Sequence, residues 1–178
     1  MKILLLFFLF LISQTVYCQF KLSQLCSYIN MPYDSLDNIL TKKGFSYNGV
    51  QKGEAGDNST HTIWGRKPDE RLGLVSTPDT VTLLFENKYN GYEDVLKKGI
   101  GFLFKKEIYY NSLITEVKNN GFKRIVSSAT SESILTAYEN DSYEVTFSKI
   151  ISERGIYYLI KIYDKAYVLL QSHIHFAE

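Results

Sequence analysis

The feature that most constrains the fold is a pattern that occurs twice, 77 residues apart. In each copy an aromatic and two aliphatic residues have the spacing i, i+3, i+7 of one helix face, and a Gly-Phe pair follows. The two copies are Tyr33, Leu36, Leu40 and Gly44-Phe45, and then Tyr110, Leu113, Val117 and Gly121-Phe122. Because glycine readily adopts the left-handed conformation that ends a helix, both copies predict a short amphipathic helix that stops at the glycine.

Four segments with alternating apolar and polar residues, rich in β-formers, follow each helix. They are Phe45–Val50, His61–Arg66, Thr80–Glu86 and Ile100–Lys105, and then Phe122–Ser127, Ser133–Tyr138, Tyr143–Ile151 and Ile156–Tyr163. The offset between matched segments falls from 77 to 56, as expected if only loops were shortened. We therefore predict an α+β fold of two tandem α-β-β-β-β units, residues 19–107 and 108–178, with antiparallel sheets and one helix packed per unit. Periodicity does not decide between a strand and a short helix for Ala166–Phe176.

The N-terminus has the layout of a signal peptide. Lys2 precedes an unbroken apolar run, Ile3–Ile12, and cleavage after Cys18 places Val16 and Cys18 at the −3 and −1 positions. A bilayer span needs about 20 apolar residues, so this run predicts a removed signal, residues 1–18, rather than an anchor. The mature chain then has no transmembrane span and is secreted or periplasmic.

A lipid-anchored form is the alternative, with Cys18 as the acylated first residue. Lipoprotein sites place a small residue before that cysteine, and the bulky Tyr17 departs from the pattern. Acyl chains would hold the protein on a membrane by partitioning into the bilayer.

Charge and cysteine content narrow the class of protein. Twenty Lys and Arg stand against nineteen Asp and Glu, which gives no long-range attraction to nucleic acid. With the signal removed, Cys26 is the only cysteine left, so the fold depends on its core rather than on an internal disulfide. We expect Cys26 to act as a small buried apolar residue.

Catalytic motifs are missing from the sequence. It contains no His-Glu-x-x-His, Cys-x-x-Cys, Walker loop or Gly-x-Ser-x-Gly, and we predict neither a catalytic residue nor a cofactor. His173 and His175 would lie on the same side of a strand as a metal-binding pair, with His61 or the terminal Glu178 as a third ligand. A solvated C-terminal tail is the more favoured interpretation of the pair.

Tyrosine is the one marked excess, with fourteen in the chain. Tyr89 and Tyr92 flank a turn, and Trp64 lies in a predicted strand beside polar loops. Rigid aromatic side chains bury contact area at low entropic cost, so we predict these three as binding residues.

Two classes of function remain. The first is an exported, non-enzymatic binding or inhibitor-like module whose partner is a protein of the cell envelope or medium. The alternative is an exported hydrolase, assisted by a metal held through His61, His173 and His175. The sequence leaves the ligand and the oligomeric state open.

Two resemblances accompany this interpretation. The two-unit α-β plan resembles, in architecture only, that of the β-lactamase inhibitor protein family, and no shared motif transfers interface residues. In its amino-acid composition, rich in Lys, Asn, Ile and Tyr, and in its short predicted signal ending before Gln19, the chain is similar to small secreted proteins of Bacteroidetes-type bacteria. Neither resemblance implies an activity.

Overall fold

The computed structural model describes residues 20–52, 59–66, 79–89, 94–153 and 155–166, with the backbone alone for residues 87–89 and 94–96. Within these residues the helices are α2 (Leu22–Ile29), α3 (Tyr33–Lys42) and α4 (Glu107–Asn119). The strands are β1 (Phe45–Lys52), β2 (Thr60–Arg66), β3 (Thr80–Tyr89), β4 (Asp94–Phe104), β5 (Lys123–Ala129), β6 (Ser133–Glu139), β7 (Tyr143–Ser152) and β8 (Gly155–Asp164). The predicted α+β class is confirmed, and each predicted strand segment overlaps an observed strand.

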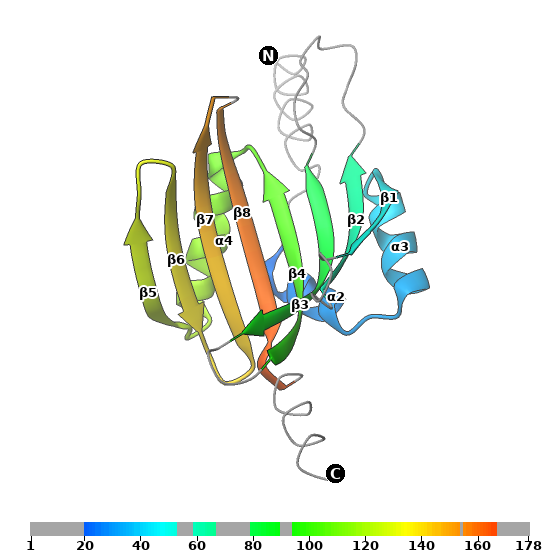
Figure 1. Cartoon of the computed structure of the whole chain (residues 1–178), viewed down its shortest axis with the longest axis horizontal. Coiled ribbons are helices and arrows are strands. Elements are labelled where there is room, and N and C mark those ends of the chain that lie inside the picture. The colour runs from blue at the N-terminus through cyan, green and yellow to red at the C-terminus, as the bar shows by residue number, and fades with distance from the viewer. Residues whose placement is uncertain (1–19, 53–58, 67–78, 90–93, 154, 167–178) are drawn as a thin grey trace, which may run out of the picture.

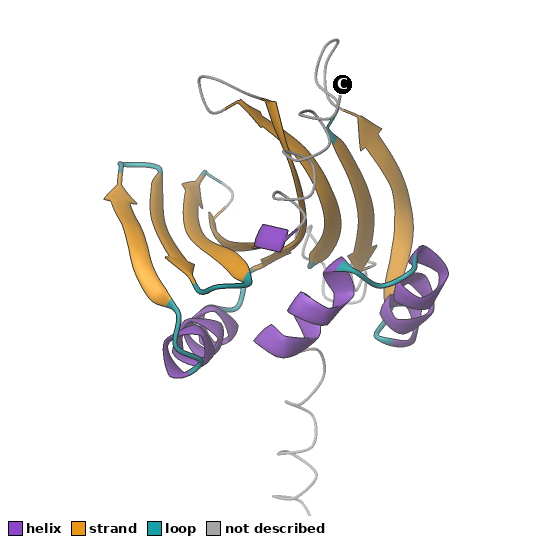
Figure 2. Ribbon diagram, turned by 90° about the horizontal axis from the view of Figure 1, so that it is seen from below, coloured by secondary structure: helices purple, strands orange, loops and turns teal. Residues whose placement is uncertain are grey.

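The eight strands form a single antiparallel sheet in the order β1-β2-β3-β4-β8-β7-β6-β5 (Figure 1). Strands that follow one another in the chain pair with one another in both halves of the sheet. β4 and β8 meet at the centre, where Gly101 is opposite Lys161. All three helices lie on the same side of the sheet (Figure 2).

The hydrophobic core lies between the sheet and the helices. Ile100, Phe102 and Phe104 of β4 point toward the helices and are almost fully buried. The ring of Phe20 meets that of Phe102 edge-on, with the ring centres 5.0 Å apart. Each large apolar side chain that is fully buried contributes about 1.5–3 kcal/mol to the free energy of unfolding, which is why this layer decides the fold.

Both predicted helices end at their glycines. Gly44 has φ +84° and Gly121 has φ +76°, the left-handed conformation that residues with a Cβ adopt only at a cost. Neither glycine has an atom within 4 Å of where its Cβ would lie, so conformation rather than crowding requires glycine there.

The structure adds a helix that the sequence analysis did not predict. In α2, Leu22, Leu25 and Ile29 are buried and have helical spacing, but they lie directly behind the predicted signal. The backbone N–H of Leu22 donates to Oε2 of Glu116 on α4 at 2.7 Å. A carboxylate at a helix N-terminus is favourable, so this bond holds α2 against α4.

For the C-terminal segment Ala166–Phe176 the sequence leaves strand and short helix open, and beyond Ala166 this segment lies outside the described residues.

Candidate functional site

The face of the sheet opposite the helices, called the opposite face below, carries the candidate site. The strand registers place rows of side chains across this face. One row crosses all eight strands and consists of Gln51, His61, Leu84, Gly99, Tyr163, Glu144, Glu139 and Lys123. Side chains alternate between the two sides of a strand, so these residues lie on the side away from the helices.

Gly99 makes room for a buried tyrosine in this row. A Cβ at Gly99 would lie 2.4 Å from the carbonyl oxygen of Ile162 and 2.7 Å from the ring of Tyr163. The ring therefore packs directly over the glycine backbone of the neighbouring strand, and Tyr163 is only 2% exposed. Its buried hydroxyl requires a polar partner.

Glu86 of β3 supplies that partner and is the centre of a polar network. Tyr163 donates its hydroxyl hydrogen to Oε2 of Glu86 at 2.5 Å, and Lys161 donates to Oε1 at 2.7 Å. Burial acts to raise the pKa of Glu86, but the hydrogen bonds from Lys161 and Tyr163 outweigh it and hold the pKa below its ordinary value. Burial and the bond to Glu86 raise the pKa of Tyr163.

His61 and Lys97 extend the network on either side. Nε2 of His61 lies 3.5 Å from Oε1 of Glu86, is buried, and has no hydrogen-bond partner among the described residues. The ammonium group of Lys97 forms an ion pair with Glu144 at 2.7 Å and lies 5.6 Å from the ring centre of Tyr163. These side chains are positioned by strands β2, β3, β4, β7 and β8 together, so the network depends on the whole sheet.

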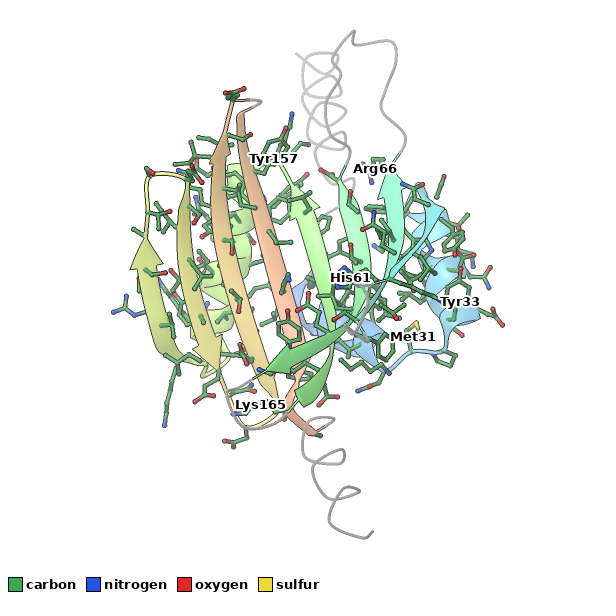
Figure 3. The ribbon with its side chains drawn as sticks, in the orientation of Figure 1. Met31, Tyr33, His61, Arg66, Tyr157 and Lys165 are labelled. Carbon is green, nitrogen blue, oxygen red and sulfur yellow. The ribbon has the colours of Figure 1, made fainter. Side chains whose placement is uncertain are left out.

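The other end of the opposite face carries large apolar side chains with serines among them: Ser148 separates Leu159 from Leu135, and Ser133 lies opposite Ile150. Leu103, Leu159 and Leu135 belong to one row across the sheet, and Ile150 lies opposite Tyr157 in the next. All five side chains are partly exposed, and we call these four aliphatic residues, together with the ring of Tyr157, the aliphatic patch. The ammonium group of Lys105 lies 4.9 Å from the ring centre of Tyr157. Figure 3 labels His61 and Tyr157 at their separate places on this face.

Trp64 does not lie on this surface. It points toward the helices, is 0% exposed, and donates its indole N–H to Oδ1 of Asp37 on α3 at 2.8 Å. The rings of Tyr33 and Tyr47, both about half exposed, lie near its ring. A tryptophan without exposed surface contributes packing to the core, and its burial gives no support to the binding role, which stays a prediction.

The other predicted site residues are only in part within the described chain. The backbone of Tyr89 ends β3, but its side chain, Tyr92, His173 and His175 lie outside the described residues. His61 is described and lies beside Glu86, as above. Among the residues that the structure describes, no three His, Cys, Asp or Glu side chains come together as metal ligands would.

Sequence reasoning missed Glu86, Lys161 and Tyr163. One signal was present: Lys161 interrupts the apolar run Ile160–Ile162, and a charge inside an otherwise apolar strand requires a partner. The identity of that partner follows only from the register, because Glu86 and Lys161 are 75 residues apart in the chain.

A cavity of about 450 Å³ lies between α2 and the end of α4, with Cys26, Glu116, Phe122 and Tyr143 in its wall. Burial raises the pKa of the Cys26 thiol to about 11, so it is protonated at neutral pH. A protonated thiol is a poor nucleophile, in keeping with the apolar role expected for Cys26.

The comparisons with known proteins add no relative: no family model, curated protein or solved structure matches the chain. Of the helices in the described parts of the chain, none has the length and apolar character needed to cross a membrane.

Proposed function

We propose that this chain is an exported, non-enzymatic binding module that holds a protein partner from the cell envelope or the medium on the opposite face of its sheet. The observation that carries the proposal is that helices cover one face of the sheet and not the other. One face is covered by α2, α3 and α4, while the other presents the aliphatic patch beside the Glu86 network. Protein interfaces commonly combine an apolar centre with surrounding polar groups.

The polar network supports binding because its charges are already held in place. Glu86 bonds to Lys161 and Tyr163, and Lys97 bonds to Glu144, within the chain itself. Side chains that are fixed before binding lose little conformational entropy when a partner arrives. The same internal pairing leaves Glu86 neutralised rather than poised for acid–base chemistry.

Export is part of the proposal and is supported by the N-terminal layout of Lys2, the apolar run Ile3–Ile12 and the cleavage position after Cys18. We infer a secreted or periplasmic location, with lipid attachment at Cys18 as the minor alternative.

We also propose that residues 19–107 and 108–178 are two tandem units, each with a helix followed by four strands, and that α2 is an additional helix before the first. The mirrored strand order supports this, since β1–β4 and β5–β8 each run in chain order from an outer edge of the sheet to the central β4–β8 pair. The ladder between β1 and β2 skips one residue at Asn48, and that between β5 and β6 skips one at Ile125, 77 residues later. A bulge at the same place in both halves is difficult to obtain by chance.

The registers also give the offset between the proposed units, strand by strand. We match β1 with β5, β2 with β6, β3 with β7 and β4 with β8, so that residues opposite one another in the first half match residues opposite one another in the second. Tyr47 then matches Arg124, an offset of 77 residues, and Phe102 matches Ile162, an offset of 60. The final offset is four residues larger than the 56 predicted from sequence. That prediction matched Gly99 with Gly155 by residue type, whereas the pairing of the strands matches Gly99 with Leu159.

The experiment is affinity capture from envelope and medium fractions with tagged chain beginning at Gln19, using three variants of matched chemistry. Leu135→Lys and Leu159→Lys each place a charge in the aliphatic patch. Ile108→Lys makes a similar change on α4, at a side chain that is 72% exposed on the helix side of the molecule.

We expect a partner that the unsubstituted chain and Ile108→Lys bind with equal affinity. Both leucine variants should bind this partner at least about tenfold more weakly, because a charge buried in the interface must be desolvated. Circular dichroism and the unfolding midpoint establish that each variant is folded. A partner that both leucine variants retain in full would place binding elsewhere on the molecule.

A further inference from the structure

Strand β5 is an outer edge of the sheet, opposite to the edge formed by β1 (Figure 1). All seven of its side chains are exposed. Ile125 and Val126 are each 46% exposed, which is high for branched aliphatic side chains in a strand. An edge strand also carries a row of backbone groups that can pair with another strand.

The ladder shows which backbone groups of β5 point outward. Thr130 donates its N–H to the carbonyl oxygen of Ser133 at 2.8 Å, so this pair is hydrogen-bonded. Bonded and non-bonded pairs alternate along antiparallel strands, and Ser128 opposite Leu135 is therefore the next bonded pair. The N–H and C=O groups of Ser127 and Ala129 point away from the sheet.

The other edge strand gives an internal comparison. Arg66 bonds toward β3 by donating its N–H to the carbonyl oxygen of Asp79 at 2.9 Å. By the same alternation, Val50 and Lys52 carry the outward backbone groups of β1. These two residues precede Ser127 and Ala129 by 77 positions. A lysine is a common protection against unwanted pairing at a sheet edge, and β5 has alanine where β1 has Lys52.

We propose that a second copy of this chain pairs antiparallel with β5, so that the two sheets join edge to edge about a twofold axis at Ser128. In this register Ser127 of each copy exchanges both backbone hydrogen bonds with Ala129 of the other. The small side chains of Ser127, Ser128 and Ala129 let the two backbones approach to the usual strand spacing of about 4.8 Å.

Charge favours the antiparallel arrangement. β5 begins with Lys123 and Arg124, and the turn that follows it contains the exposed Glu132. Antiparallel pairing brings the basic start of each strand to the acidic turn of the other copy. Parallel pairing would place the basic ends together, at an electrostatic cost.

The test measures the mass of the purified exported chain by sedimentation equilibrium over a wide concentration range. We expect a monomer–dimer equilibrium with no larger species, because pairing two edges about a twofold axis uses both of them. Ala129→Pro removes one outward N–H and no bond within the sheet, and we expect it to remain monomeric over the range in which the unsubstituted chain dimerises.

Val50→Pro is the matched control, because it removes an outward N–H from the β1 edge. We expect it to dimerise like the unsubstituted chain. A chain that is monomeric at every concentration overturns the proposal. The proposal is also overturned if Ala129→Pro still dimerises, or if Ala129→Pro and Val50→Pro weaken dimerisation equally.

A charge-reversal cycle tests the register without introducing proline. Glu132→Lys should raise the dimer dissociation constant about tenfold, since two attractive contacts per dimer become repulsive. Combining it with Arg124→Glu should restore most of the loss. If the double variant is weaker than either single variant, Arg124 and Glu132 do not face each other across the axis.

Discussion

The two halves of the sheet present the same ladder with different chemistry on the opposite face. His61, Glu86 and Lys97 of the first half correspond, row by row, to Leu135, Ile150 and Tyr157 of the second. The first set belongs to the polar network around Glu86, and the second lies in the aliphatic patch. The comparison teaches that the strand framework fixes where side chains lie but leaves their chemistry free. One face can therefore hold a charged end and an apolar end.

The largest effect should come from the glycines of β4, which test how the two halves meet. Gly99→Ala places a methyl group against the carbonyl oxygen of Ile162, a backbone atom that cannot move aside cheaply. We expect the free energy of unfolding to fall by about 3 kcal/mol.

Gly101→Ala is the matched control, because its Cβ would meet nothing closer than 3.6 Å. Chemical denaturation of both variants measures the difference. Equal losses at the two positions would mean that Tyr163 does not pack over Gly99 as described.

The next effect tests the charged end of the opposite face through pH. The folded-state pKa of Glu86 is lower than its ordinary value of 4.5, so its network stabilises the fold fully above that value. This stability is lost as the pH falls from about 4.5 through the folded-state pKa. Glu86→Gln should lower the free energy of unfolding by about 1–2 kcal/mol at pH 7, with the difference from the unsubstituted chain shrinking in acid.

Glu139→Gln is the control for this prediction, because Glu139 pairs with Lys165 at a more exposed site. Solvent screens that pair, and we expect a loss of no more than about 0.5 kcal/mol at pH 7. Denaturation curves at pH 3, 5 and 7 compare the two variants. A Glu86→Gln loss that stays constant over this range would show that Glu86 does not titrate below its ordinary value.

The smallest effect concerns His61 and the hydrolase alternative. The Lys161 ammonium group binds the same Glu86 oxygen that His61 approaches, and a positive charge there opposes a metal ion. We expect added zinc to leave the unfolding midpoint unchanged and no stoichiometric zinc in the purified protein. Stoichiometric zinc that is lost in His61→Ala would restore the metal-assisted hydrolase as the leading function.

Local patterns were enough to predict much of the fold. The spacing of Leu36 and Leu40 before Gly44 and the alternation along the strands indicated two helices and eight strand segments. These patterns could be recognised because each is contained within a single helix or strand. β4 begins six residues earlier than predicted, at Asp94, where Lys97 and Lys98 interrupt the apolar pattern. The sequence did not predict α2 because its apolar spacing comes directly after the apolar run of the predicted signal.

The site was less predictable because it is assembled by register. Trp64 was chosen for its aromatic character, but whether a strand residue faces a helix or solvent depends on which side of the sheet the helices cover. Glu86, Lys161 and His61 come from three strands, and no local pattern states which residues of distant strands are opposite one another. The order and pairing of the strands supply that information.

The pairing of β4 with β8 has a consequence for how fast the protein folds. Every other pair in the described sheet joins consecutive strands, whereas Phe104 meets Tyr158 and Gly99 meets Tyr163 across more than fifty residues of chain. Hairpins between consecutive strands form in about 1–10 μs. A pairing between strands so far apart in the chain requires a long loop to close, and the chain loses conformational entropy when it does. The hairpins of each half can therefore form early, and the pairing of β4 with β8 sets the rate at which the complete sheet forms.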